Sequence, residues 1–414
     1  MAIFIFRGDA SVTQQVDTFT IAATWAASDT IAIRITDLNA NGVFQDESFV
    51  AAGSDKETIR DAFLAVLVAS TQSLFAAISF AASGTDKITL SNKINGRPQL
   101  SANTGTVTAG SGTWTHAATT ANSGPHDFNT AGNWDDQAGG AAGEVPGASA
   151  SADVNFSDCD VDLLYGLDQS AAANVLTSLT RHPSHTGSIG DPTNGYFLHI
   201  DAADVKINGK RGKPTYFNAV SIPTLTVVGN VGHSKFKGTV VTFRIGGEAG
   251  GTVELLDSAT VTTFINSSAA YVICGKSITG LVTVLNTRGR LLTKSNMTNL
   301  LVSGGHVISE QGNISGTGGI AGANPGVKIE GGVCELRGVA VYSLVTTTGG
   351  LTKIGSPEGP HTSATKAHPV VSNMTIEDGV VEQVSEVTFS AAINQHSAGL
   401  FKPFWRQSFT PASL

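Results

Sequence analysis

A short apolar motif recurs along the second half of the chain and restricts the folds that this chain can adopt. Apolar residues occupy its first and fourth positions, and the copies are Leu176–Leu179, Ile222–Leu225, Val261–Phe264, Ile278–Leu281, Met297–Leu300 and Val341–Leu344. Their starts are 46, 39, 17, 19 and 44 residues apart, so the long gaps are close to twice the short ones. A fixed unit of roughly 20 residues indicates a solenoid of stacked repeats.

The composition favours the same fold class. Of the 414 residues 47 are Gly and only 14% are charged, which is typical of β structure with small side chains and many tight turns. A solenoid also has no upper size limit, whereas a single compact core rarely serves more than about 250–300 residues. We therefore predict a mainly β protein, a right-handed parallel β-helix preceded by a small α+β domain.

Changes in composition along the chain divide it into five segments. We expect an N-terminal arm over residues 1–11, a small α+β attachment domain over 12–122, and a connector with the solenoid cap over 123–170. The parallel β-helix follows over 171–385, and residues 386–414 form a C-terminal docking or capping tail.

The attachment domain contains one clear helix signal among its strands. Residues 16–22 and 30–36 alternate as strands do, and strands resume at residues 76–80 and 87–90. Between them, Ser54 and Glu57 have the spacing of a capping box that opens a helix. The apolar residues that follow have the spacing of one buried helix face: Ile59, Ala62, Phe63, Val66 and Leu67.

An ordered series of short motifs carries a family resemblance. The series is Asn133-Trp134, Val145-Pro-Gly147, Asp153-Val-Asn-Phe156, Gly166-Leu-Asp-Gln-Ser170 and Gly187-Ser-Ile-Gly190. It resembles the start of the repeat region in phage-associated and bacterial surface β-helix proteins of the virion structural type, over roughly residues 125 to 350. The resemblance implies that the segment around Trp134 caps the first rung of the solenoid, and it brings no catalytic residues.

The resemblance implies a bacteriophage virion structural protein. We expect a capsid-decorating or tail-associated spike that attaches through its N-terminal domain and projects a rod, with other virion proteins, major capsid or tail proteins, as partners. Such a protein is assembled in the host cytoplasm and ends up in the extracellular particle. A homo-oligomer, dimer or trimer, is expected because rods with apolar ends gain by packing in symmetric assemblies.

Charge and hydropathy exclude two classes of partner. A net charge of −8 argues against nucleic acid, whose phosphates call for an excess of Lys and Arg. The apolar run at residues 3–6 is too short for a membrane span or a signal-peptide core, so no membrane partner is expected.

One stretch has the spacing of a calcium loop. Asp37, Asn39 and Asn41 stand at positions 1, 3 and 5 before Gly42, and Asp46 supplies a further oxygen, although the twelfth position is Ser48 rather than a bidentate Glu. The alternative is that Asn41-Gly42 is the turn of a two-residue hairpin. Both interpretations stay open here, and calcium is the one cofactor that the sequence suggests.

The remaining candidates are a tail, three cysteines and two acidic or basic clusters. The tail carries Phe401, Phe404, Trp405 and Phe409, which suit either capping or docking on a neighbouring subunit. Cys159, Cys274 and Cys334 are far apart and are expected to be buried free thiols. Asp158, Asp160 and Asp162 are expected on one face of a strand, and His182 and His185 in a polar loop.

Two other functions remain as alternatives. A tailspike that binds or degrades host surface glycan would need two facing carboxylates and aromatic platforms. The repeats contain acidic residues, yet all four tryptophans lie outside them, so we expect no enzyme. The second alternative is a bacterial surface adhesin.

Overall fold

The computed structural model describes residues 3–36, 43–136, 145–146, 153–166, 175–191, 197–209, 212–281, 283–316, 326–337, 340–355 and 369–404. Over these residues the chain is mainly β with a large, mostly parallel sheet, which confirms the predicted class at this level. Two compact units emerge from the contacts: residues 1–174 with 187–198, and residues 175–186 with 199–414.

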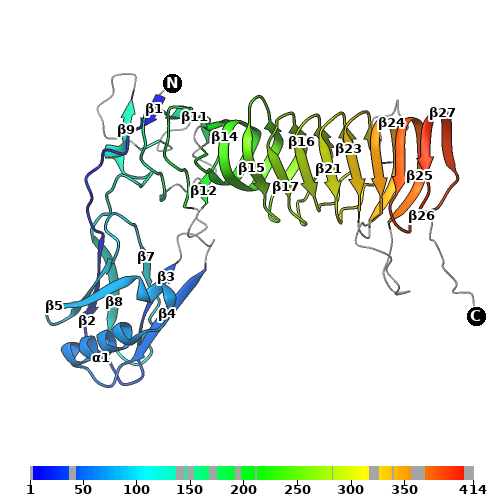
Figure 1. Cartoon of the computed structure of the whole chain (residues 1–414). Helices are drawn as coiled ribbons and strands as arrows, with labels where there is room; N and C mark the ends of the chain where they lie inside the picture. Colours follow the sequence, from blue (N-terminus) through cyan, green and yellow to red (C-terminus); the bar gives the residue numbers. More distant parts are fainter. Residues whose placement is uncertain are drawn as a thin grey trace, which may run out of the picture. The chain divides into compact units, whose positions relative to one another are not determined.

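Two antiparallel sheets form most of the first unit (Figure 1). One has the strand order β5 (Ile78–Ser83), β6 (Lys87–Asn92), β2 (Val16–Ala22) and β8 (Thr113–Thr120). The other has the order β4 (Phe44–Val50), β3 (Thr30–Thr36) and β7 (Leu100–Asn103). Apolar residues from both sheets and from the helices share one buried core, which includes Phe19, Ile33, Phe63 and Trp114.

Helix α1 (Lys56–Ala69) buries the face that its sequence predicts, and a short helix α2 (Ser73–Ala76) follows it. Ile59, Phe63 and Leu67 are buried. The cap differs from the prediction, because Asp55 and not Ser54 is the N-cap residue. Its carboxylate accepts a hydrogen bond of 2.8 Å from the backbone N–H of Thr58, and so satisfies one of the unpaired donors of the first turn.

Strands β3 and β4 are the two strands of the predicted hairpin. They pair antiparallel, with Thr36 opposite Phe44 and Thr30 opposite Val50. The antiparallel pairing of the two strands is therefore confirmed. The predicted turn at Asn41-Gly42 lies outside the described residues.

Three short paired strands in the first unit contribute to an aromatic cluster. β1 (Ile3–Phe6) pairs in parallel with β10 (Asp153–Phe156) and antiparallel with β9 (Trp134–Asp136), which follows the single-turn 3-10 helix η1 (Ala131–Asn133). The predicted N-terminal arm is therefore part of a sheet. Asn133 is fully buried, accepts from the N–H of Ala10 at 3.0 Å and donates to the carbonyls of Gly124 and Asp127 at 2.7 Å.

The second unit is a succession of strands that pair in parallel. Its strands are β11 (Leu176–Arg181), β12 (Leu198–Ile200, shared with the first unit at Leu198), β13 (Ala202–Gly209), β14 (Tyr216–Ile245), β15 (Gly250–Leu255), β16 (Thr260–Asn266), β17 (Tyr271–Cys274), β18 (Thr283–Asn286), β19 (Arg290–Thr293), β20 (Asn299–Val302), β21 (His306–Ser309), β22 (Val327–Ile329), β23 (Val333–Leu336), β24 (Val341–Ile354), β25 (Val370–Gln383), β26 (Thr388–Phe389) and β27 (Ile393–Lys402). Figure 1 shows them following one another in chain order from β14 to β27.

The register of these strands repeats at the predicted interval. From β14 to β22 each strand pairs with the second one along the chain, as β16 does with β18 and β18 with β20. One column of partners runs through Phe243, Phe264, Val284, Leu300, Val327 and Val345, in steps of 21, 20, 16, 27 and 18 residues. All six side chains are fully buried, so the column forms part of a continuous apolar interior.

The sequence motif marks the interior in five of its six copies. The first and fourth residues are buried in the copies from Leu176 to Leu300. In the last copy Val341 is 43% exposed, and the buried residues are Tyr342 and Val345, one position later. Because successive side chains of a strand point to opposite faces, a shift of one position exchanges inside and outside.

Glycines stack at one turn of the repeat. Gly289, Gly305, Gly332, Gly350 and Gly379 all have φ between +72° and +83°. A Cβ added to Gly305, Gly332, Gly350 or Gly379 would lie 2.3–2.7 Å from the carbonyl oxygen of the glycine before it in the column. Both the backbone conformation and the close approach of the next strand therefore require glycine there.

Candidate functional site

The predicted calcium loop lies largely outside the described residues. Asp37, Asn39 and Asn41 fall there, and Asp46 lies on β4. The two Asp46 carboxylate oxygens accept from Nε and Nη2 of Arg34 at 2.8 Å, and this pairing lowers the pKa of Asp46. Asp46 thus already has a cationic partner. In the part of the chain that the structure describes, no three His, Cys, Asp or Glu side chains gather as a metal site would require.

Trp134, the predicted cap residue, is the centre of the aromatic cluster in the first unit. Its ring is 2% exposed and contacts Phe6, Phe128 and Phe156 at centroid distances of 5.2, 4.7 and 5.8 Å, and its indole N–H donates to the carbonyl of Phe128 at 2.7 Å. These contacts join strands that lie more than 100 residues apart in sequence. The Asn-Trp motif therefore has a structural role within its own unit.

Of the four predicted docking residues in the tail, the structure describes two. Phe401 lies on β27, pairs in register with the buried Val381 and contacts the ring of Phe389 at 6.0 Å. Phe404 follows the strand and is half-buried. Trp405 and Phe409 lie outside the described residues.

Two further expectations about reactive side chains have different outcomes. The prediction that Asp158, Asp160 and Asp162 share a strand face is wrong, because residues 157–162 form no strand and Asp158 has φ of +52°. The three cysteines are free and buried, as predicted. Burial raises the pKa of Cys274 and of Cys334 to about 12, so neither thiol is a nucleophile at neutral pH.

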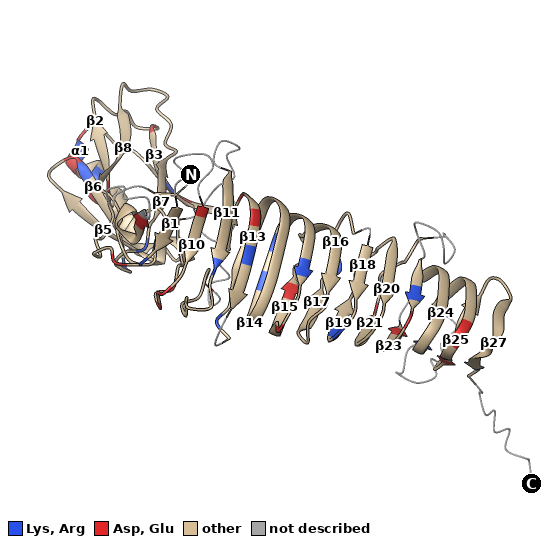
Figure 2. Cartoon of the chain, turned by 90° about the horizontal axis from the view of Figure 1, so that it is seen from above, with Lys and Arg blue, Asp and Glu red and all other residues tan. Residues whose placement is uncertain are grey.

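Figure 2 shows charged residues spread over the strands of the second unit, and several of them stand in register in two neighbouring columns. The first column contains His233, Thr252, Tyr271, Arg290 and His306 in register. The second contains Lys235, Glu254, Ile273, Leu292, Ile308 and Glu335. We call this surface the charged face, and it is the best candidate functional surface of the second unit.

Each glutamate of the charged face is held by two cationic or histidine side chains. Glu254 Oε2 lies 2.8 Å from His233 Nε2 and 3.5 Å from Lys235 Nζ, both on the preceding strand. Glu335 lies 2.8 Å from His306 Nε2, and Arg337 Nε donates to it at 2.8 Å. Burial raises the pKa of Glu335, but the hydrogen bonds from Arg337 and His306 outweigh it and leave that pKa below its usual range.

The spacing of the two glutamates limits the chemistry of this face. Four register steps separate Glu254 from Glu335, which at ~4.8 Å per strand is ~19 Å. Glycoside hydrolysis by a carboxylate pair uses separations of about 5–9.5 Å. These two carboxylates are therefore too far apart to act as a catalytic pair. Each of them instead pairs with a histidine on a neighbouring strand and so links the two strands.

The aromatic residue of the charged face pairs with a cation. Tyr271 is half-buried, and the guanidinium of Arg290 lies 5.1 Å from its ring centroid on the next strand of the column. Another tyrosine of the second unit, Tyr342, is fully buried and donates to the carbonyl of Arg337 at 3.1 Å.

Sequence reasoning did not single out the His–Glu pairs. His233 and Glu254 are 21 residues apart and His306 and Glu335 are 29 apart, which are separations of one repeat step. A search for opposite charges at the repeat interval would have found the first pair, because residues one step apart are neighbours in the stack.

Comparison with known proteins adds no relative to this picture. No family model, curated protein or solved structure matches the chain. Among the described residues, no helix has both the length and the apolar character that crossing a bilayer requires.

Proposed function

We propose that the second unit is a right-handed parallel β-helix and that the chain is a bacteriophage virion structural protein. In this proposal it is a capsid-decorating or tail-associated spike, which attaches through its N-terminal domain and projects the β-helix as a rod. Its partners are other virion proteins, either major capsid or tail proteins, and it acts as a dimer or trimer.

The observation that carries the proposal is the unbroken column of parallel partners from Phe243 to Val345. Each step of about 20 residues returns the chain to the same apolar column, as one coil of a β-helix does. The glycine column from Gly289 to Gly379 supports the same interpretation, because one turn in each coil stacks directly on the turn before it.

Dense pairing between coils suits a mechanical role. Backbone hydrogen bonds join each described strand to its neighbours, and the interior is filled by Leu, Val, Ile and Phe. On the charged face the ion pairs at Glu254 and Glu335 also link successive strands. A shaft of this kind resists unfolding and proteolysis because opening one coil breaks contacts on both of its sides.

The sequence series from Asn133-Trp134 to Gly187-Ser-Ile-Gly190 supports the assignment to a virus particle, since it resembles phage-associated β-helix proteins. Mass spectrometry of density-purified particles from a lysing culture tests this assignment. We expect the chain in intact particles at a fixed ratio to the major capsid protein, and immunogold label at a constant position. Finding the chain on uninfected cells and in no particle would support the adhesin instead.

A glycan-binding tailspike is the second candidate, favoured by the half-buried Tyr271 ring beside Arg290 on the charged face. An aromatic ring with a neighbouring hydrogen-bond donor is a common element of sugar-binding surfaces. Binding of purified capsule polysaccharide that is lost in Tyr271→Ala and kept in Tyr342→Phe would favour this function over a purely structural one.

A further inference from the structure

Two columns on the outside of the second unit carry matching apolar stretches. The first, which we call the β16 column, runs in register through Arg244, Ile265, Leu285, Leu301 and Lys328. The second, which we call the β17 column, is the part of the charged face that runs through Glu254, Ile273, Leu292, Ile308 and Glu335. Each column therefore places three large aliphatic side chains between two charged ones.

Most of these aliphatic side chains lie on the outer surface. Ile265 stands between Phe264 and Asn266, which are both fully buried, so its own side chain points outward. The half-buried aliphatic residues with two buried neighbours of this kind are Ile265, Leu285, Leu301, Ile273 and Leu292. Ile308 is buried, at 3% exposure. Single aliphatic side chains are ordinary on a protein surface, whereas contiguous strips of them mark an interaction surface.

The two columns match level by level. Each strand of the β16 column is followed directly along the chain by a strand of the β17 column, as β16 is by β17 and β18 by β19. The level partners are Arg244 with Glu254, Ile265 with Ile273, Leu285 with Leu292, Leu301 with Ile308, and Lys328 with Glu335. Because each pair belongs to one coil of the proposed β-helix, a basic residue stands at the height of an acidic one, and an aliphatic residue at the height of another.

At one end of the columns, both charged side chains have room for a further partner. Arg244 is exposed, and no carboxylate pairs with it among the described residues. At the same level, Glu254 contacts His233 and Lys235 through Oε2. Its Oε1 has no partner in the described part of the chain, and the side chain is 24% exposed. A guanidinium that approached this atom from a second molecule would form a charge-assisted hydrogen bond.

The charges also select how two copies of this chain fit together. A two-fold axis across the β-helix would lay each column against its own copy in reverse, so that Arg244 would meet Lys328 and Glu254 would meet Glu335. Both contacts join like charges, which disfavours this arrangement. Lys328 and Glu335 already have one ion-pair partner each within the chain, so the preference comes chiefly from Arg244 and Glu254.

An axis along the β-helix gives the opposite result. It lays the β16 column of one copy against the β17 column of the next copy at the same height. Basic residues then meet acidic ones at both ends of the columns, and aliphatic residues meet aliphatic ones between them. The surface is thus complementary to a second copy of the same chain.

We propose that copies of this chain associate side by side and in parallel, with the β16 column of one copy packed on the β17 column of the next. Arg244 of one copy then donates to Glu254 Oε1 of the next. This inference rests on the β-helix of the proposed function, and it assigns the surface and the direction of the oligomer.

The test measures association of the full-length protein by sedimentation velocity from about 1 to 100 µM. We expect a dimer or trimer. Leu285→Asp and Leu292→Lys each place a charge in one aliphatic strip and should raise the apparent Kd at least about tenfold. Val68→Asp, at a 67% exposed position of the first unit, is the matched control and should leave it unchanged.

The double variant Leu285→Asp with Leu292→Lys tests which column meets which. If the β16 column packs on the β17 column, the variant brings opposite charges together at every contact and should associate at least about threefold more tightly than either single variant. If each column packs on its own copy, the double variant brings like charges together and should associate no better.

Cross-linking gives a second measurement that does not depend on charged variants. Leu285→Cys and Leu292→Cys are placed in two co-expressed chains with different tags, and a bismaleimide that spans about 10 Å, the distance between packed sheets, is added. We expect links between the two kinds of chain, and none between two chains that both carry Leu285→Cys.

A protein that stays monomeric throughout the concentration range would overturn the proposal. Links only between identical positions, or a double variant no better than the single ones, would overturn it too. A monomeric chain that is nevertheless found in purified particles would reject this interface and keep the virion assignment, so the two proposals fail separately.

Discussion

Replacement of one stacked glycine tests whether the coils lie directly on one another. In Gly332→Ala the new Cβ would stand 2.4 Å from the Gly305 carbonyl oxygen, 2.7 Å from the Gly304 carbonyl carbon and 2.8 Å from the Gly305 nitrogen. All three are backbone atoms, so the clash cannot be relieved by moving a side chain. The left-handed conformation at φ +72° costs about 1–2 kcal/mol for alanine, and overpacking adds about 1–3 kcal/mol. We expect a loss of about 2–5 kcal/mol.

Gly250→Ala is the matched control, because it makes the same chemical change in open space. Its added Cβ has no heavy atom within 4 Å, and its φ lies outside the left-handed region. Alanine there is expected to leave stability unchanged or to raise it by up to about 1 kcal/mol, since it reduces the freedom of the unfolded chain. Calorimetry of both variants measures the melting transition of the second unit. Gly332→Ala should melt at least about 5 °C lower, and equal melting temperatures would refute direct stacking.

Three further predictions concern single side chains. Asp29 is fully buried and accepts hydrogen bonds from the backbone N–H groups of Ala109, Ala26, Thr108 and Gly110, which lower its pKa to about 2 from 3.8. Its stabilising contribution is therefore present above about pH 4 and is lost as the pH falls through about 2. The variant Asp29→Asn should remove this acid dependence of stability in titrations followed by Trp fluorescence. Trp134→Ala should destabilise the first unit by about 3–5 kcal/mol in calorimetry, and a loss under about 1 kcal/mol would contradict its central packing role. Cys274 and Cys334 should resist iodoacetamide at pH 8 and react only in urea, and labelling of the native protein would contradict their burial.

Periodic patterns predicted the mainly β class and several single elements correctly because they report burial directly. The face of α1 and the strands at residues 16–22 and 30–36 were predicted from alternation and helical spacing alone. The repeat of roughly 20 residues matches the register of the parallel strands. In each case an apolar residue at the predicted position faces a core, which is the physical basis of the pattern.

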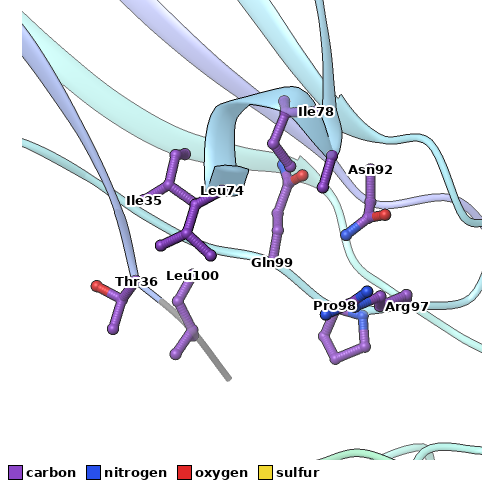
Figure 3. A pocket seen from close by; sticks show the side chains of 10 residues that line it. Ile35, Thr36, Leu74, Ile78, Asn92, Arg97, Pro98, Gln99 and Leu100 are labelled. Atoms are coloured by element: carbon purple, nitrogen blue, oxygen red, sulfur yellow. The ribbon is translucent and has the colours of Figure 1, made fainter. Parts of the chain in front are cut away.

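Features that depend on geometry at single residues were less predictable. At the start of α1, Ser54 and Asp55 are both good caps, and only the backbone path decides that Asp55 reaches Thr58. At the motif copy of residues 341–344, apolar residues at neighbouring positions allow either register, and the stack selects Tyr342 and Val345. The small pocket lined by Ile35, Leu74, Asn92 and Gln99 (Figure 3) brings together residues from four separate segments, so local sequence carries no signal for it.

The most direct test of the account is disulfide trapping along one column of half-buried threonines. Thr242, Thr263 and Thr283 are register partners in turn, so neighbours in the column are separated by ~4.8 Å, within the range of about 4.4–6.8 Å between the Cα atoms of a disulfide. Mild oxidation should link Thr242→Cys with Thr263→Cys and Thr263→Cys with Thr283→Cys in the respective double variants, as read by mass spectrometry. The pair Thr242→Cys with Thr283→Cys, two strands apart, should stay reduced. Linkage of that outer pair, or of none of the three, would contradict a shaft built from stacked coils.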